Sequence, residues 1–155
     1  MIYQVIKYKN KKLRKKSKEI EIKSKINNVI KNMFETMKDK NGIGLAAPQI
    51  GKNIRLFIIK IRNKKKTFKK VFINPKIVNE FGKFCKYEEG CLSIPKIKIK
   101  IFRKENVTIE YFDQLWNKKE NVFTGIIARI IQHEYDHLEG ILHVDHIEKS
   151  YNKLK

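Results

Sequence analysis

The sequence has few residues of the kinds that cross-link, break or turn a polypeptide. Its 155 residues include two cysteines, three prolines and seven glycines. Two cysteines are too few for the disulfide framework of a small secreted protein, so we expect Cys85 and Cys91 to be reduced thiols. No internal repeat or linker divides the sequence, which predicts a single domain over residues 1–155.

Long apolar runs are also missing. No stretch approaches the roughly 20 apolar residues that cross a bilayer, and the first residues lack the hydrophobic core and small-residue cleavage site of a signal peptide. We therefore expect no membrane segment and a cytoplasmic location.

Acidic residues are scarce as well: 16 Asp and Glu stand against 36 Lys and Arg, a formal charge of +20. Basic residues concentrate in 7–18 and 60–70. Such a charge raises the alternative of a nucleic-acid-binding domain. However, lysine greatly outnumbers arginine, and isoleucine and asparagine are abundant. This composition favours a general bias that places lysine at solvated positions.

Apolar periodicity predicts two helices. The first, over 23–40, is expected to end at Asn41-Gly42 and carries one apolar stripe, formed by Ile26, Val29, Ile30, Met33, Phe34 and Met37. The second begins after Thr124, a suitable N-cap, continues through recurring isoleucines and ends before Gly140.

The middle of the sequence predicts strands. They are expected over 55–61, 71–73, 77–87 with a turn near Asn79, 97–103, 107–112 and 116–123, the last joined through a hairpin connection at 113–117. Strict alternation from Ile97 to Ile101 predicts one buried and one wet face. The order predicts an α+β fold in which antiparallel or mixed sheets pack around a helix in the C-terminal half, with a further helix near the N-terminus.

The most informative pattern is His-Glu-x-x-His at His133, Glu134 and His137. On a helix, imidazoles at i and i+4 lie one turn apart and can bind one divalent ion, while the adjacent carboxylate can accept a proton from the attacking water. The apolar stripe through Ile126 and Ile130 continues onto both histidines, so they should face the interior. The spacing predicts a metal site with its own proton acceptor.

A catalytic ion typically takes three protein ligands and keeps one position for water, so a third ligand is needed. Cys91 lies in the segment 88–95, where glycine and proline interrupt a strand-like stretch. Cys85 has the setting of an ordinary strand residue, on what we expect to be the strand adjoining Cys91. We therefore predict Cys91 as the third ligand and a structural role for Cys85.

Three segments stand out in order: 42–51 with GIGLAAPQIG, 89–93 with EGCLS, and 132–137 with QHEYDH. Together they resemble the bacterial peptide deformylase family, over nearly the whole chain from about Lys12 to about Asp145. The resemblance implies a monomeric hydrolase that removes the N-formyl group from the initiator methionine of nascent polypeptides and releases formate. It also implies one divalent ion per chain, ferrous iron in the cell, with zinc, nickel or cobalt suiting the same ligands in a purified form.

The resemblance assigns roles to individual residues. Glu134 would be the general base and acid, while the Gln49 side-chain amide and the Leu92 backbone N–H would stabilise the developing oxyanion. The metal ligands would be Cys91, His133 and His137. Substrate contacts, including the pocket for the methionine side chain, would come from Ile43, Gly44, Tyr87, Glu89, Gly90, Ile126, Arg129 and Ile130.

Some positions depart from the family pattern. Lys98 stands where some relatives have a substrate-contacting arginine; Arg103 is a candidate substitute, but we favour a strand-end charge for it. Few residues follow Asp145, where many relatives carry a longer C-terminal helix, so we expect no ribosome docking by that route. A weak electrostatic attraction to ribosomal RNA is a separate hypothesis.

Two alternatives to a deformylase remain. A zinc endopeptidase would take its third ligand downstream, where Glu139, His143 and His146 lie, but it would leave the Cys91 and Gln49 motifs without a role. A nucleic-acid-binding domain with a structural metal would need a closed, four-coordinate site, to which Cys85 is poorly spaced.

Overall fold

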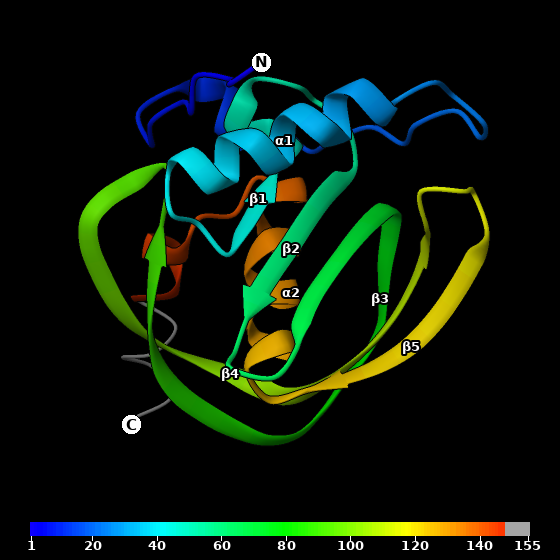
Figure 1. The fold of residues 1–155 in the computed structure, drawn as a ribbon. Coiled ribbons are helices and arrows are strands. Elements are labelled where there is room, and N and C mark those ends of the chain that lie inside the picture. Colours follow the sequence, from blue (N-terminus) through cyan, green and yellow to red (C-terminus); the bar gives the residue numbers. More distant parts are fainter. Residues whose placement is uncertain (148–155) are drawn as a thin grey trace.

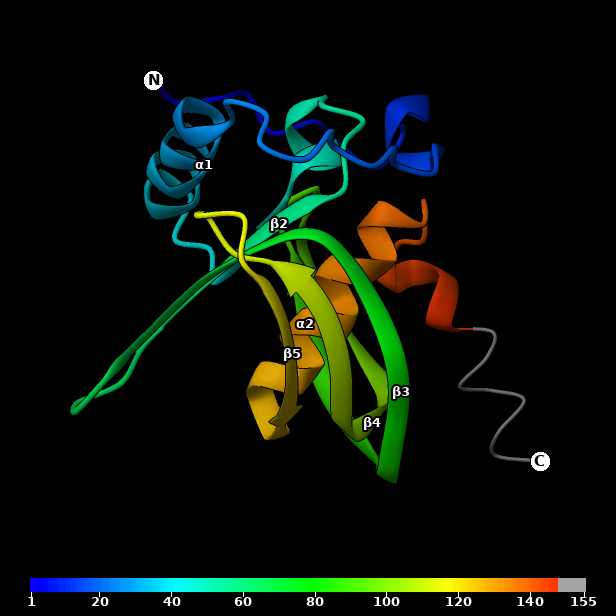
Figure 2. The same cartoon turned by 90° about the vertical axis from the view of Figure 1, so that its right-hand side faces the viewer.

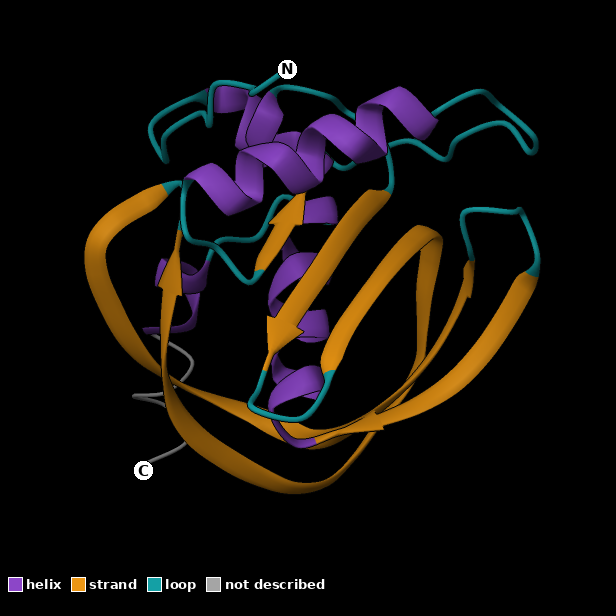
Figure 3. Ribbon diagram, viewed as in Figure 1, coloured by secondary structure: helices purple, strands orange, loops and turns teal. Residues whose placement is uncertain are grey.

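The computed structural model describes residues 1–147, in which one antiparallel sheet curls around a helix (Figures 1 and 3). The sheet order is β1-β2-β3-β4-β5. The strands are β1 Gly44–Ala46, β2 Leu56–Arg62, β3 Thr67–Cys91, β4 Ile94–Phe112 and β5 Lys118–Thr124. The helices are α1 Asn27–Asp39 and α2 Gly125–Leu138, and the 3-10 helices are η1 Lys11–Arg14, η2 Ala47–Ile50 and η3 His143–Asp145. This architecture confirms the predicted α+β class.

Strand β2 separates two apolar cores. Phe57 and Ile59 belong to the cluster that packs on α2, whereas Leu56 and Ile58 belong to the cluster that packs on α1. Because successive side chains of a strand point to opposite faces, a strand covered on both faces needs an unbroken apolar run. The far end of the β2–β3 hairpin projects away from both cores (Figure 2).

Helix α1 begins at Asn27, so the predicted start at Lys23 is wrong. Lys23 has a φ of 67°, a left-handed conformation incompatible with a continuing α-helix, and Ile26 occupies the N-cap position. The centre of the predicted apolar stripe is buried.

The four strands predicted over 71–73, 77–87, 97–103 and 107–112 are parts of two long strands, β3 and β4. The expected turn near Asn79 is wrong, because Asn79 pairs with Thr108 and the ladder shifts register between Ile77 and Asn79 instead. A bulge of this kind takes up an extra residue and bends the strand without ending it. The bends let the β3–β4 pair wrap around α2. Strands β2 and β5 lie within two residues of their expected bounds.

The alternation from Ile97 to Ile101 does not give the buried face that it predicts. Ile101 is fully buried, but Ile97 is 47 % exposed. Ile97 lies where the β3–β4 hairpin lines an open hollow rather than a core. The alternation therefore predicted the strand correctly, but it predicted more burial of this face than the structure shows.

Within residues 1–147, no helix is long and apolar enough to span a membrane. The expectation about a short C-terminal tail falls largely on residues 148–155, outside the described part of the chain.

Candidate active site

Helix α2 presents the His-Glu-x-x-His motif to the interior. Gly125, with a φ of 60°, starts the helix after Thr124, which holds the N-cap position without a side-chain hydrogen bond. Gly140 follows its end in a left-handed conformation. Only 8 % of His133 and 1 % of His137 is exposed, as the apolar stripe predicts.

Cys91 joins both histidines at the end of β3. The possible ligand atoms of Cys91, His133 and His137 all lie within 4.8 Å of one another, and Cys91 Sγ lies 3.4 Å from His137 Nε2. The pairing of Cys91 with Ile94 closes the β3–β4 hairpin at this point. Cys85 is outside this group; it lies on the same strand as Cys91, not on the adjoining strand as expected.

This donor set fits a divalent transition metal. Two imidazoles and one thiolate are common ligands for such ions, and three protein ligands leave a position for water. Burial lowers the pKa of His137 well below its ordinary value, so that its imidazole is neutral and able to act as a ligand. At His133 burial also opposes the charged form, but hydrogen bonds to Cys91 and Glu89 outweigh it and raise the pKa to about 10. The surroundings of His133 therefore favour positive charge at this position.

Glu89 orients His133. Its Oε1 lies 2.9 Å from His133 Nδ1, which leaves Nε2 for the metal position. Arg103 donates to both carboxylate oxygens, at 2.6 and 2.9 Å, and Arg129 Nη1 donates to Oε2 at 2.6 Å. Burial would raise the pKa of Glu89, but the hydrogen bonds from His133 and Arg103 outweigh it and hold that pKa far below its usual range. Glu89 therefore stays ionised.

Arg103 is not the strand-end charge that we expected. It lies within β4, is 5 % exposed, and its Nη1 donates to Asp136 at 2.9 Å. Asp136 in turn lies 2.8 Å from His146 Nε2. A buried guanidinium requires such carboxylate partners. Arg103 is engaged with Glu89 and Asp136, and it does not line the cavity described below.

Glu134 lies against β1 without a fixed partner. Its carboxylate is buried, and Oε2 has no hydrogen-bond partner among the described residues. Burial raises its pKa to about 7. A Cβ atom at Gly44 would lie 2.5 Å from Glu134 Oε1, so only glycine leaves room for this carboxylate.

Gln49 is held by η2 with its amide nitrogen toward the thiol. Its Oε1 accepts from the Ala46 backbone N–H at 2.9 Å, and its Nε2 lies 3.2 Å from Ser93 Oγ and 3.7 Å from Cys91 Sγ. Because the Gln49 oxygen accepts from Ala46, the NH2 group of the amide must be the end that faces Cys91 and Ser93.

A cavity of about 660 Å³ opens in front of these groups. The predicted site residues that line it are Ile43, Gly44, Gln49, Glu89, Gly90, Cys91, Leu92, Ile126, Arg129, Ile130, His133 and Glu134. Tyr87 lies outside this lining; it is 63 % exposed and stacks on the Arg129 guanidinium, 5.2 Å from the ring centroid. The lining also includes Lys7, Lys40, Asn41, Gly42, Glu88, Pro95 and Lys96, for which the sequence predicted no substrate contact, and Lys98, which stands where some relatives have a substrate-contacting arginine.

The downstream residues proposed as endopeptidase ligands are engaged elsewhere. Glu139 accepts from Arg55 at 2.7 Å, His146 contacts Asp136, and His143 Nε2 lies 3.4 Å from the Ile97 carbonyl. Within residues 1–147, none of the three joins the possible metal ligands.

A helix-borne His-Glu-x-x-His motif, a thiol as third possible ligand and a cavity open to solvent define a hydrolase with room for one metal ion. The family profile described as polypeptide deformylase matches residues 2–153. This chain belongs to the peptide deformylase family, as the three segments predicted, and is an enzyme of that family.

Relatives with known sequences support the assignment. A peptide deformylase of Karelsulcia muelleri is 53 % identical over 149 residues, which covers 95 % of this chain and 79 % of that protein. One of Cytophaga hutchinsonii is 44 % identical, covering 99 % and 86 %.

Solved structures agree. A class I type b peptide deformylase from Acinetobacter baumannii, bound to Met-Ala-Ser, has a TM-score of 0.89 and 33 % identity over 95 % of this chain and 99 % of that one. A peptide deformylase from Synechococcus elongatus in complex with actinonin has a TM-score of 0.88 and 37 % identity, covering 93 % and 79 %.

Proposed function

We propose that this chain removes the formyl group from formyl-methionyl nascent peptides with one divalent ion held by Cys91, His133 and His137. The observation that carries the proposal is the convergence of these three possible ligands beside Glu134, whose buried Oε2 has no hydrogen-bond partner among the described residues. When bound, the ion would polarise the formyl carbonyl and make the attacking water more acidic.

Glu134 would move the proton. It takes a proton from the attacking water and delivers it to the nitrogen of the leaving amine, so that formate and a free α-amino group result. A group whose pKa lies near 7 both accepts and releases a proton readily at neutral pH. The absence of a side chain at Gly44 would leave the Glu134 carboxylate room beside the reacting atoms.

Gln49 would stabilise the transition state. Negative charge develops on the formyl oxygen during attack, and Gln49 Nε2, fixed by its acceptor end on Ala46, is a preorganised donor beside Cys91. The backbone N–H of Leu92, the residue after Cys91, would be the second donor.

The substrate would bind as an added strand. Among the described strands β1 pairs only with β2, and its residue Gly44 lines the cavity, so an extended peptide can pair along this edge. Ile43, Ile126 and Ile130 would receive the unbranched methionine side chain. The Met-Ala-Ser bound to the Acinetobacter baumannii enzyme is a peptide of this kind.

Formate release from formyl-Met-Ala-Ser, by protein prepared without oxygen, tests the activity and the ligands together. Cys91→Ala should abolish turnover and metal binding, whereas Cys85→Ala, which removes the other thiol of β3, should retain both. Glu134→Ala should retain the metal and lose about two to four orders of magnitude in kcat. Turnover that survives Cys91→Ala or Glu134→Ala would refute the assignment.

We further propose ferrous iron as the ion in the cell, since imidazole and thiolate ligands accept iron as well as zinc, nickel or cobalt. Exposure to air should then inactivate the enzyme through the metal and the Cys91 thiolate. Elemental analysis of anaerobically prepared protein measures the metal directly. Full activity after prolonged aeration would argue for another ion.

We also propose that the protein is a cytoplasmic monomer and that it is weakly attracted to ribosomes in a salt-sensitive way. The formal charge of +20 favours contact with RNA phosphates. Light scattering measures the oligomeric state. Co-sedimentation with ribosomes should fall steeply between low and moderate salt; a salt-independent fraction would contradict the electrostatic account.

A further inference from the structure

Four lysines surround the mouth of the cavity. They come from three separate parts of the chain: the N-terminal segment, the C-cap of α1 and the β3–β4 hairpin. We call this set the lysine rim; it consists of Lys7, Lys40, Lys96 and Lys98, all exposed.

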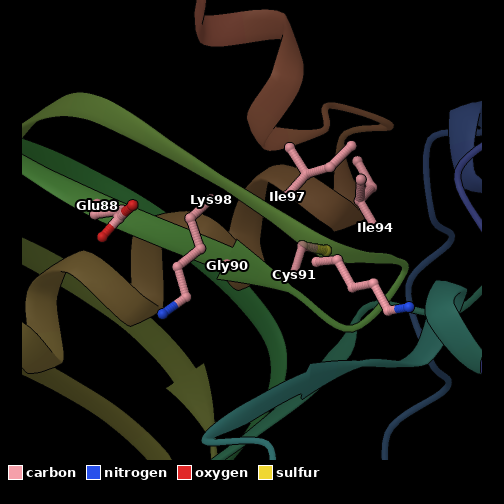
Figure 4. A pocket seen from close by; sticks show the side chains of 7 residues that line it. Glu88, Gly90, Cys91, Ile94, Ile97 and Lys98 are labelled. Carbon is pink, nitrogen blue, oxygen red and sulfur yellow. The ribbon is translucent and has the colours of Figure 1, made fainter.

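The acidic residues of the lining do not balance the lysine rim. Glu89 is committed to Arg103, Arg129 and His133, and Glu134 is buried beside the metal position. Glu88 is therefore the one exposed carboxylate among the described lining residues. Figure 4 shows Glu88 and Lys98 on adjacent strands of the hairpin that carries Cys91, where a hollow of about 440 Å³ adjoins the cavity.

Two members of the rim have partial partners. Lys40 Nζ lies 3.0 Å from Asp39 Oδ2, and both side chains of this pair are exposed. Lys7 Nζ donates to the Leu92 carbonyl at 3.3 Å. Exposed pairs of this kind are weak. Lys96 and Lys98 have no carboxylate within ion-pair distance in the described part of the chain. Their charges are open to a ligand.

We infer that the lysine rim makes the enzyme select formyl-methionyl peptides whose second and third residues are acidic. The inference rests on the proposed function, which places the formyl group at Cys91 and the methionine side chain against Ile126 and Ile130. A peptide anchored at both points leaves through the mouth, so its next side chains pass the rim. Complementary charge there speeds encounter and favours the bound state, whereas a basic peptide is repelled.

Three peptides with amidated C-termini isolate the effect of side-chain charge: formyl-Met-Glu-Asp, its neutral counterpart formyl-Met-Gln-Asn, and formyl-Met-Lys-Lys. At low salt we expect kcat/KM for the acidic peptide to exceed that for the basic one about five- to thirtyfold, the product of a few exposed charge interactions. Salt near 0.5 M should reduce this ratio to within about twofold of one, because exposed charges are then screened.

Matched variants separate the rim from the overall charge. Lys96→Gln with Lys98→Gln should lower the acidic-to-basic ratio at least threefold, and Glu at both positions should bring it below one. Lys64→Gln with Lys65→Gln removes the same charge from the projecting β2–β3 connection, outside the cavity lining, and should leave the ratio unchanged.

The ratio of two peptides on one enzyme sample cancels any loss of metal or folded protein. A wild-type ratio of one or less at low salt overturns the inference, as does an equal effect of the two Gln pairs. Turnover of formyl-Met-Gln-Asn without charge discrimination leaves the proposed function intact. Absence of formate from all three peptides overturns both.

Discussion

Gly44→Ala tests whether the place of Glu134, rather than its presence alone, controls the reaction. The new methyl carbon would lie 2.5 Å from Glu134 Oε1 and 3.0 Å from its Cγ and Cδ. These distances are shorter than ordinary van der Waals contact, which begins at 3.4 Å. Gly44 does not have a positive φ, so alanine adds no backbone strain there. The nearest atoms all belong to the Glu134 side chain, which must therefore move away.

A displacement of about 1 Å at a reacting group costs on the order of 100-fold in rate, so kcat should fall by about that factor. Bound metal and melting temperature should change little, because no ligand or core side chain is among the atoms nearest to the new methyl group. Formate release, metal content and a thermal melt of the same sample measure all three.

Gly90→Ala provides the matched comparison. Gly90 lines the same cavity, but a Cβ there meets nothing within 4 Å, so a much smaller loss is expected. Full activity of Gly44→Ala would refute the reasoning that this contact positions the base. A large loss of melting temperature would show instead that the methyl group disturbs the fold.

Three further predictions follow from contacts around the site. Glu89→Gln should weaken metal binding about 10- to 100-fold in a chelator titration, because His133 loses the carboxylate that orients it; unchanged affinity would contradict that role. Gln49→Ala should lower kcat about 100- to 1000-fold with a nearly constant KM in steady-state kinetics, since its donor acts mainly in the transition state; a change confined to KM would point to ground-state binding. Burial opposes ionisation of Asp145, but hydrogen bonds from Arg14 and from the Leu142 backbone N–H outweigh burial and lower the pKa of Asp145 below its ordinary value of 3.8. The ionised carboxylate therefore stabilises the fold above pH 3.8, and this stabilisation is lost as pH falls through the lowered pKa. Asp145→Asn should therefore lower the melting temperature at pH 7, and the difference should shrink as pH falls through the lowered pKa; a difference that does not change with pH would rule out the linkage.

The common inward face of the two histidines could be predicted from the sequence because the pattern is local. His133 and His137 are one helical turn apart, so their common face follows from helix geometry alone. The prediction of Cys91 as a third possible ligand depended on motif context, since nothing in its spacing brings it to α2. The fold class was predictable from periodicity, but the joining of strand pairs into β3 and β4 was not, because a bulge and a turn have similar local sequences.

The role of Arg103 could not be predicted from the sequence. Its partners Glu89 and Asp136 are 14 and 33 residues away, and only the folded sheet brings them together. An arginine in an alternating strand is equally compatible with a solvated charge. The lysine rim is a similar case, since three distant segments converge at the mouth and each alone reads as ordinary surface.

The junction of Glu89 with Arg103, Arg129 and His133 has a consequence for how this chain can change over generations. Replacing the Glu89 carboxylate alone leaves the buried Arg129 guanidinium without a carboxylate partner and Arg103 with Asp136 alone. Replacing Arg103 alone removes a cationic partner from both Glu89 and Asp136. Each single step is therefore expected to be deleterious even where the combined change is tolerable. These positions should be inherited as a block, and lineages that alter one should carry a compensating substitution at another.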